Sequence, residues 1–234
     1  MNSKTKNVTV NMLHVPGAPG RDAVVQYFSS TPGVDLAVHS DPYRRGVMWN
    51  WTQAMAYIVR NKEHERQPWT IMLQDDVVPA ADDWLEQLQE ATENSPSPLL
   101  GLFHLGGLGE RTAAKGAAYA LGSDVLWGPA YAIRSDILED MARWCITVSQ
   151  RTGYPHDDRL MCAFMLKQQQ RIAVTARSFF TLKTVPSLMG HTAHVQPRPT
   201  LTIADAGPAW NPRSTASAGR STPPEITTLA KESL

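Results

Sequence analysis

Two spacings of apolar residues alternate along most of the chain. Runs rich in β-branched and other apolar residues, typical of strands, occupy residues 8–15, 34–39, 69–73, 99–105, 125–133 and 172–175. Segments with apolar residues three and four positions apart, typical of helices, occupy residues 21–29, 46–59, 80–92, 135–149 and 157–169. The run at 69–73 is apolar nearly throughout, as a strand buried on both faces requires. This alternation predicts an α/β fold with a mostly parallel central sheet flanked by helices.

Three segments lie outside this pattern. Residues 1–7 are polar, and we predict a flexible N-terminus. Residues 106–122 are rich in glycine and alanine, which favours a mobile loop. Residues 207–234 are rich in Pro, Ser, Thr and Ala and lack periodic apolar residues, which predicts a disordered tail. The remainder, residues 8–206, is expected to form a single domain.

Charge and cysteine content narrow the choice of partners and compartment. The chain carries 22 basic and 22 acidic residues, so no global positive field gathers nucleic acid. Cys145 and Cys162 form neither a disulfide framework nor a zinc signature, and buried free thiols in a reducing cytoplasm are expected. We expect no transmembrane segment, because no apolar run is long enough to span a bilayer.

Two adjacent carboxylates, Asp75 and Asp76, directly follow the apolar run at 69–73. In open α/β sheets, ligands bind outside the carboxyl ends of the strands. Buried unpaired carboxylates are costly, and a divalent cation with a preference for oxygen ligands, Mg²⁺ or Mn²⁺, removes that cost. The alternative interpretation is that both residues cap the helix expected near residue 80.

The segment WTIMLQDDVVP, Trp69 to Pro79, resembles the Asp-X-Asp region of glycosyltransferases with the GT-A fold, in particular the inverting, family 2-like members. The resemblance implies that Asp76 binds Mn²⁺ or Mg²⁺ together with the diphosphate of a nucleotide sugar. Gln74 takes the place of the first aspartate of the motif, so the sequence departs from the pattern there. Asp75 is then expected near the sugar or a metal-bound water.

Other segments extend the resemblance in the family's order. Asp41 lies where the family has an acidic residue that contacts the base. The segment from His156 to Leu160 resembles the Glu-Asp-X-X-Leu motif, which implies Asp158 as catalytic base and Asp157 in the glutamate position, although the leucine comes one residue early. Capping of a helix is the alternative role for both aspartates. His191 resembles a late metal-binding histidine on a loop over the donor, and an exposed loop histidine is the alternative.

The family layout also implies a wall for the nucleoside and phosphates of the donor. Residues 14–16, His14, Val15 and Pro16, are expected beside the uridine base. Arg21 is expected to meet a phosphate, and Arg45 and Trp49 to lie close to the donor. Trp51 fits the apolar stripe of its helix, so Trp49, two positions away, faces elsewhere.

The resemblance therefore implies a metal-dependent hexosyltransferase that moves a sugar from a UDP-sugar to an acceptor hydroxyl with inversion. Small transferases of this appearance resemble bacteriophage and bacterial enzymes, which makes a hydroxymethylated pyrimidine in phage DNA, a polysaccharide or a lipopolysaccharide the expected acceptor. A nucleotidyltransferase is one alternative, but the prolines in residues 15–21 remove donors that would cradle a phosphate. A catalytically inactive module that binds nucleotide sugars is another.

Overall fold

A central eight-stranded sheet organises the molecule. The computed structural model describes residues 8–183, 201–205, 213–219 and 221–232. The strand order is β10-β6-β8-β5-β7-β3-β1-β2. The strands are β1 (Val8–His14), β2 (Val34–Ser40), β3 (Trp69–Gln74), β5 (Leu99–Gly101), β6 (Tyr119–Gly122), β7 (Ala130–Arg134), β8 (Ile172–Thr175) and β10 (Thr215–Ser217). A separate antiparallel pair is formed by β4 (Val77–Pro79) and β9 (Phe180–Leu182).

Most strands of the sheet run in one direction. β1 pairs in parallel with β2 and β3, and β5 pairs in parallel with β8. β7 lies antiparallel between β3 and β5, so these two groups point the same way, while β6 and β10 are reversed. The predicted α/β fold with a mostly parallel sheet flanked by helices is confirmed.

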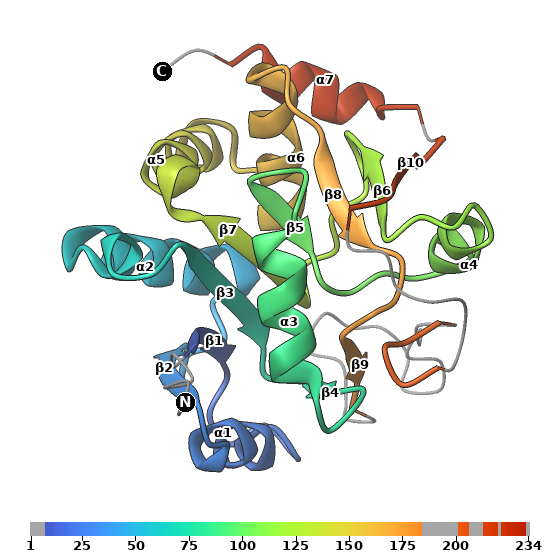
Figure 1. The fold of residues 1–234 in the computed structure, drawn as a ribbon. Coiled ribbons are helices and arrows are strands. Elements are labelled where there is room, and N and C mark those ends of the chain that lie inside the picture. Colours follow the sequence, from blue (N-terminus) through green and yellow to red (C-terminus); the bar gives the residue numbers. More distant parts are fainter. Residues whose placement is uncertain (1–7, 184–200, 206–212, 220, 233–234) are drawn as a thin grey trace.

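Helices flank the sheet (Figure 1), and each face of the sheet carries its own hydrophobic core. Alternate side chains of β3 serve both cores: Ile71 and Leu73 pack on one face, and Met72 packs on the other. One face is covered by α1 (Asp22–Ser30) and α3 (Trp84–Glu93). The opposite face is covered by α2 (Val47–Arg60), α5 (Ser135–Thr152), α6 (Asp157–Lys167) and α7 (Pro224–Ala230). The described residues also contain two short helices, η1 (Glu63–Glu65) and α4 (Leu108–Ala113).

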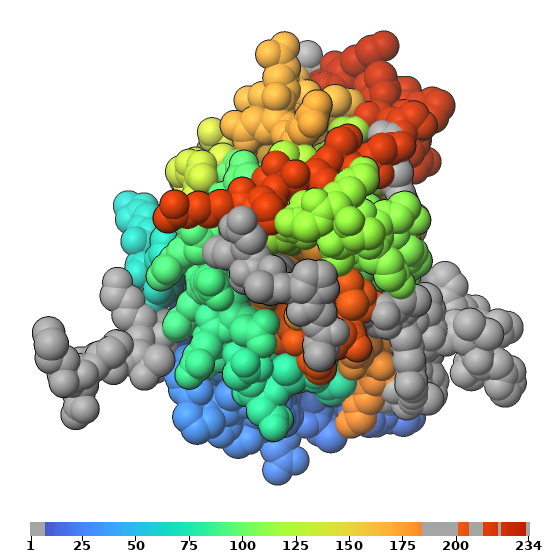
Figure 2. All heavy atoms as spheres, turned by 45° about the vertical axis from the view of Figure 1, so that its right-hand side comes forward, coloured from blue at the N-terminus to red at the C-terminus, as the bar shows by residue number. Residues whose placement is uncertain are grey.

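The structure corrects two of the predicted segments. Residues 106–122, expected to be a mobile loop, contain α4 and strand β6. Residues 207–234, expected to be disordered, contain β10, which pairs with β6, and α7, whose Ile226 and Leu229 are buried. In Figure 2 the red C-terminal segment runs over the surface beside the light green segment that contains β6. Two predicted strands, at 99–105 and 125–133, are shorter than expected.

None of the helices in the described ranges has the length and apolar character that a membrane span requires.

Candidate active site

The carboxyl ends of β1, β2 and β3 bring three sequence-predicted site residues to one edge of the sheet. Asp41 follows β2, and its backbone N–H donates to the carbonyl oxygen of His14 at 2.8 Å. Asp75 follows β3, and its backbone N–H donates to the carbonyl oxygen of Leu13 at 3.1 Å. These bonds continue the parallel pairing beyond the strands and fix the three residues as neighbours.

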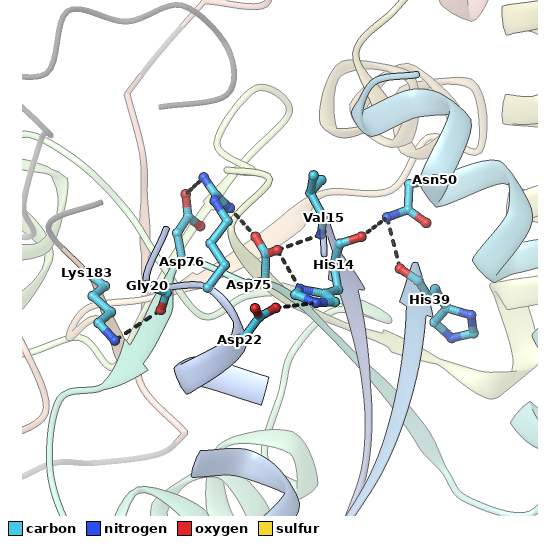
Figure 3. A network of polar contacts seen from close by, with 10 residues as sticks. His14, Val15, Gly20, Asp22, His39, Asn50, Asp75, Asp76 and Lys183 are labelled. Carbon is cyan, nitrogen blue, oxygen red and sulfur yellow. Dashed lines mark hydrogen bonds and ion pairs between the residues drawn. The ribbon is translucent and has the colours of Figure 1, made fainter. Parts of the chain in front are cut away.

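The Asp75 carboxylate is occupied by the protein's own donors (Figure 3). Its Oδ2 accepts from the backbone N–H of Val15 at 2.7 Å and lies 2.8 Å from Nδ1 of His14, whereas Oδ1 accepts from Arg21. The residue is only 1% exposed. Both oxygens of Asp75 thus already have partners inside the protein, and the contact of Asp75 with the donor sugar or a metal-bound water stays a prediction.

Asp76 is in a different position. Its Oδ2 lies 3.2 Å from Nη2 of Arg21, but its buried Oδ1 has no hydrogen-bond partner among the described residues. Burial raises the pKa of the Asp76 carboxyl, and the charge of Arg21 opposes that rise. The helix α3 begins only at Trp84, after β4, so the interpretation of Asp75 and Asp76 as its caps is wrong.

Arg21 joins the two carboxylates from the start of α1. The residue is 5% exposed, and its two terminal nitrogens contact Asp75 and Asp76 respectively. Its Nε is buried and has no hydrogen-bond partner within the described part of the chain. The sequence predicted a phosphate as the partner of Arg21, whereas the structure places this side chain against the acidic pair. His14 extends the network, with Nε2 3.1 Å from the Asp22 carboxylate.

A second acidic pair, Asp157 and Asp158, opens α6 beside the end of β3. Gly128 lies between them and Gln74: a Cβ added there would be 3.3 Å from Nε2 of Gln74 and 3.9 Å from an oxygen of each aspartate. The backbone N–H of Gln74 also donates to Pro129 at 2.9 Å. The lack of a side chain at position 128 thus leaves the space in which Gln74 and the two carboxylates face one another.

Burial and mutual repulsion govern the ionisation of this second pair. Burial, followed by the charge of Asp158, raises the pKa of Asp157 from 3.8 to about 7. The hydroxyl of Tyr131 accepts from Nε1 of Trp51 at 2.8 Å and donates to Oδ2 of Asp157 at 3.4 Å. Burial also raises the pKa of Asp158, opposed by the backbone N–H of Arg159, which donates to Oδ1 at 2.8 Å. Asp158 therefore partly satisfies the helix terminus, and the capping and catalytic interpretations are compatible.

The residues predicted for the donor wall meet after β2. Asp41 is buried, and its Oδ2 accepts from the backbone N–H of Gly46 at 3.1 Å. Arg45 lies with Nε 3.7 Å from Oδ1 of Asp41, and its guanidinium carbon is 3.4 Å from the ring centroid of Trp49. This stack leaves Arg45 partly exposed at the edge of the sheet. Val15 and Pro16 adjoin His14, while His191 lies outside the described residues.

Sequence reasoning missed two contributors to the site. Lys183 donates from its backbone N–H to the carbonyl oxygen of Asp76 at 2.6 Å and from Nζ to Gly20 at 3.1 Å (Figure 3). Tyr131 contacts Asp157 from within β7. Neither residue belongs to a motif, and only the pairing of β4 with β9 and of β7 with β3 brings them to the site.

The described ranges contain no group of three or more His, Cys, Asp or Glu residues able to hold a metal ion. Asp76 fits a hard cation, because one of its carboxylate oxygens is buried without a hydrogen-bond partner among the described residues. Asp41 also has such an oxygen, Oδ1, but Nε of Arg45 lies 3.7 Å from it. Asp75 is less available than Asp76 as a direct metal ligand, since both of its oxygens are bound by donors of the protein. A cation at this site would thus depend on a single carboxylate and on ligands brought by a substrate.

Comparisons with known proteins find structural likenesses at low sequence identity. No protein-family model and no curated protein matches the chain. The solved structures with similar folds include A197 from STIV, at 14% identity over 75% of this chain and 83% of that chain, with a TM-score of 0.45. A glycosyltransferase involved in glycosylation of the major capsid of PBCV-1 shows 12% identity over 72% and 81%, with a TM-score of 0.43. A mannosyltransferase from Pyrobaculum calidifontis in complex with GDP-Man and Mn²⁺ shows 14% identity over 73% and 56%, with a TM-score of 0.39. Likenesses this remote carry no argument about the activity of this chain.

Proposed function

We propose that this protein is an inverting glycosyltransferase of the GT-A type that uses a nucleotide diphosphate sugar. The observation that carries the proposal is the position of two acidic pairs near the same end of β3. Asp76 offers a carboxylate oxygen without a partner among the described residues, and Asp158 lies across Gly128 from the neighbouring Gln74. Sugar transfer needs these two functions, one that binds a diphosphate through a cation and one that accepts a proton.

The donor would lie along the ends of β1, β2 and β3. Asp76 would hold Mn²⁺ or Mg²⁺ together with the diphosphate, as such cations usually bind one or two carboxylates plus substrate phosphates. When bound, the cation stabilises the charge that develops on the leaving diphosphate. Asp41, His14 and the Arg45–Trp49 stack would form the wall for the nucleoside, for which we propose uridine.

The acceptor hydroxyl would approach Asp158. Its carboxylate is half-buried and takes the hydroxyl proton as the oxygen attacks the anomeric carbon from the face opposite the diphosphate, which inverts the configuration. Asp157, with its pKa raised to about 7, would share a proton at neutral pH, so that a single negative charge faces the acceptor. The Tyr131 hydroxyl would hold Asp157 in place.

The experiment that tests this proposal separates binding from chemistry in two isosteric variants. Asp76→Asn should weaken Mn²⁺-dependent binding of UDP. Asp158→Asn should leave that binding unchanged and reduce sugar transfer by about 10²–10⁴-fold, the usual contribution of a general base. Transfer is measured with UDP-glucose and two acceptor pools, hydroxymethylated DNA and bacterial polysaccharide.

Asp140→Asn provides the matched control, because this exposed aspartate of α5 lies in neither acidic pair. It should behave as the wild type in both assays. Equal loss of UDP binding in Asp76→Asn and Asp158→Asn would contradict the division of roles.

A further inference from the structure

We propose that Arg21 acts as an exchangeable counter-ion: it offsets one of the two negative charges of the acidic pair Asp75–Asp76 in the free protein and passes from Asp76 to the diphosphate when donor and cation bind. This inference rests on the proposed function, because it concerns the same donor site. It makes binding of the cation dependent on binding of the nucleotide.

The two carboxylates that contact Arg21 differ in the other hydrogen-bond donors that they have. Asp75 also receives the Val15 backbone N–H at 2.7 Å and has His14 at 2.8 Å, so this carboxylate is held from three sides. Among the described residues, Arg21 is the one side chain that bonds to the Asp76 carboxylate, at 3.2 Å to Oδ2, and the Oδ1 of Asp76 has no hydrogen-bond partner. The Arg21–Asp75 ion pair is therefore fixed, and the Arg21–Asp76 ion pair is the one that a stronger cation displaces.

The charges of the site explain why a cation alone is a poor competitor. The guanidinium and the two carboxylates together leave one negative charge, held in a region where Arg21 and Asp75 are almost fully buried. A divalent cation on Asp76 reverses that sign and lies beside the positive Arg21, and such repulsion is poorly screened in a buried site. A diphosphate that arrives with the cation restores the balance.

The guanidinium also has capacity for a new partner. Arg21 presents five N–H donors in a rigid fork, and its buried Nε has no acceptor among the described residues. Charge-assisted bonds from a guanidinium to phosphate are frequently bidentate, and they are stronger than neutral hydrogen bonds. A diphosphate oxygen thus satisfies a donor that the acidic pair leaves unpaired, and it replaces the Asp76 carboxylate as a partner of the guanidinium.

The experiment measures binding of Mn²⁺ and of UDP by isothermal titration calorimetry, each with and without the other, so that no turnover is required. In the wild type, Mn²⁺ should bind weakly alone and at least about ten-fold more tightly with UDP, which corresponds to about 1.4 kcal/mol of coupling. Arg21→Gln removes the competing charge, so Mn²⁺ alone should bind more tightly, while UDP in the presence of Mn²⁺ binds more weakly.

Arg21→Lys is the second variant, because it keeps the buried positive charge if Arg21→Gln does not fold. A lysine is a point charge without the fork. It should leave the affinity for Mn²⁺ alone low and reduce the affinity for UDP with Mn²⁺ by about ten-fold. Arg143→Lys, on the exposed surface of α5, is the matched control and should change neither affinity.

The possible outcomes distinguish a failure of this inference from a failure of the proposed function. Wild-type protein that binds no nucleoside diphosphate with Mn²⁺ would contradict the proposed function itself. Wild-type protein that binds UDP with Mn²⁺, together with an Arg21→Lys variant that binds it equally tightly, would overturn only the role of Arg21. A folded Arg21→Gln variant with unchanged affinity for Mn²⁺ alone would also overturn it.

Discussion

Within each acidic pair of the site, the two carboxylates differ in their hydrogen-bond partners or in their burial. Asp75 and Asp76 are neighbours in sequence, but only Asp75 has a full set of donors. Asp157 and Asp158 are also neighbours, and Asp157 is the more deeply buried of the two. We assign a role in ligand binding to Asp76, which has fewer hydrogen-bond donors than Asp75, and to Asp158, which is more exposed than Asp157. The better-bonded Asp75 and the more deeply buried Asp157 hold the neighbouring backbone in position.

The raised pKa of Asp157 predicts a pH dependence of stability. Below about pH 4 the residue is protonated in both the folded and the unfolded state. Between pH 4 and its folded pKa of about 7, the unfolded state ionises first, so the stability that Asp157 contributes is lost as the pH rises. Asp157→Asn cannot ionise, and its free energy of unfolding relative to the wild type should therefore increase from pH 5 to pH 8. Urea unfolding at both pH values measures the difference.

Two comparisons make that result specific. The half-buried His39, whose pKa is lowered to about 4, titrates in wild type and variant alike, so its effect cancels in the difference. Asp140→Asn should show the same offset from the wild type at both pH values. An Asp157→Asn offset that is flat from pH 5 to pH 8 would show that Asp157 is already ionised across this range.

The sequence predicted which residues gather at the site better than it predicted their partners. Asp75, Asp76 and Asp41 directly follow strands, so their common edge follows from parallel pairing alone. The partner of Arg21 depends on how α1 packs, because the same side chain reaches a phosphate or a carboxylate according to its rotamer. The space that Gly128 leaves could not be predicted from the sequence, since it exists only where α6 approaches β3.

At the scale of elements, the C-terminal segment supports the helix that carries the proposed base. α7 packs against α6, and the Glu232 carbonyl oxygen that follows it accepts from Trp144 of α5 at 3.3 Å and from Lys167 of α6 at 3.1 Å. Its periodicity escaped the sequence reasoning because a helix of seven residues presents only one apolar pair, Ile226 and Leu229. Residues 108–113 were missed for the same reason: α4 is a single short helix with few apolar positions.

Truncation of Ile226 tests this support. The side chain is fully buried in the core beneath α5 and α6. Ile226→Ala should lower the free energy of unfolding by about 2–5 kcal/mol, as large-to-small changes in a core do. Thr227→Ala, on the exposed side of α7, should change it by at most about 0.5 kcal/mol. Chemical denaturation that finds the two variants equal would mean that the C-terminal segment is not part of the cooperative unit.

At the scale of the whole molecule, the candidate site lies at the edge of the sheet where the parallel strands β1, β2 and β3 end. The alternation of strands and helices predicted this architecture, because each βα unit returns the chain to the same edge of the sheet. The reversed strands β7, β6 and β10 were not predictable in the same way, because the amino-acid sequence of a strand does not show in which direction the strand runs within the sheet. The reversal of β7 matters for the proposed site, because it brings Gly128 and Pro129 to the end of β3.

The central claim is that this edge binds a nucleoside diphosphate together with a divalent cation. The most direct measurement is the thermal stability of the protein with UDP, GDP, CMP or TDP, each with and without Mn²⁺. A ligand present at about one hundred times its dissociation constant should stabilise the protein by about 2.7 kcal/mol. We predict a stabilisation by UDP that requires Mn²⁺ and is lost in Asp76→Asn. No stabilisation by any nucleotide with Mn²⁺ would contradict the proposed function.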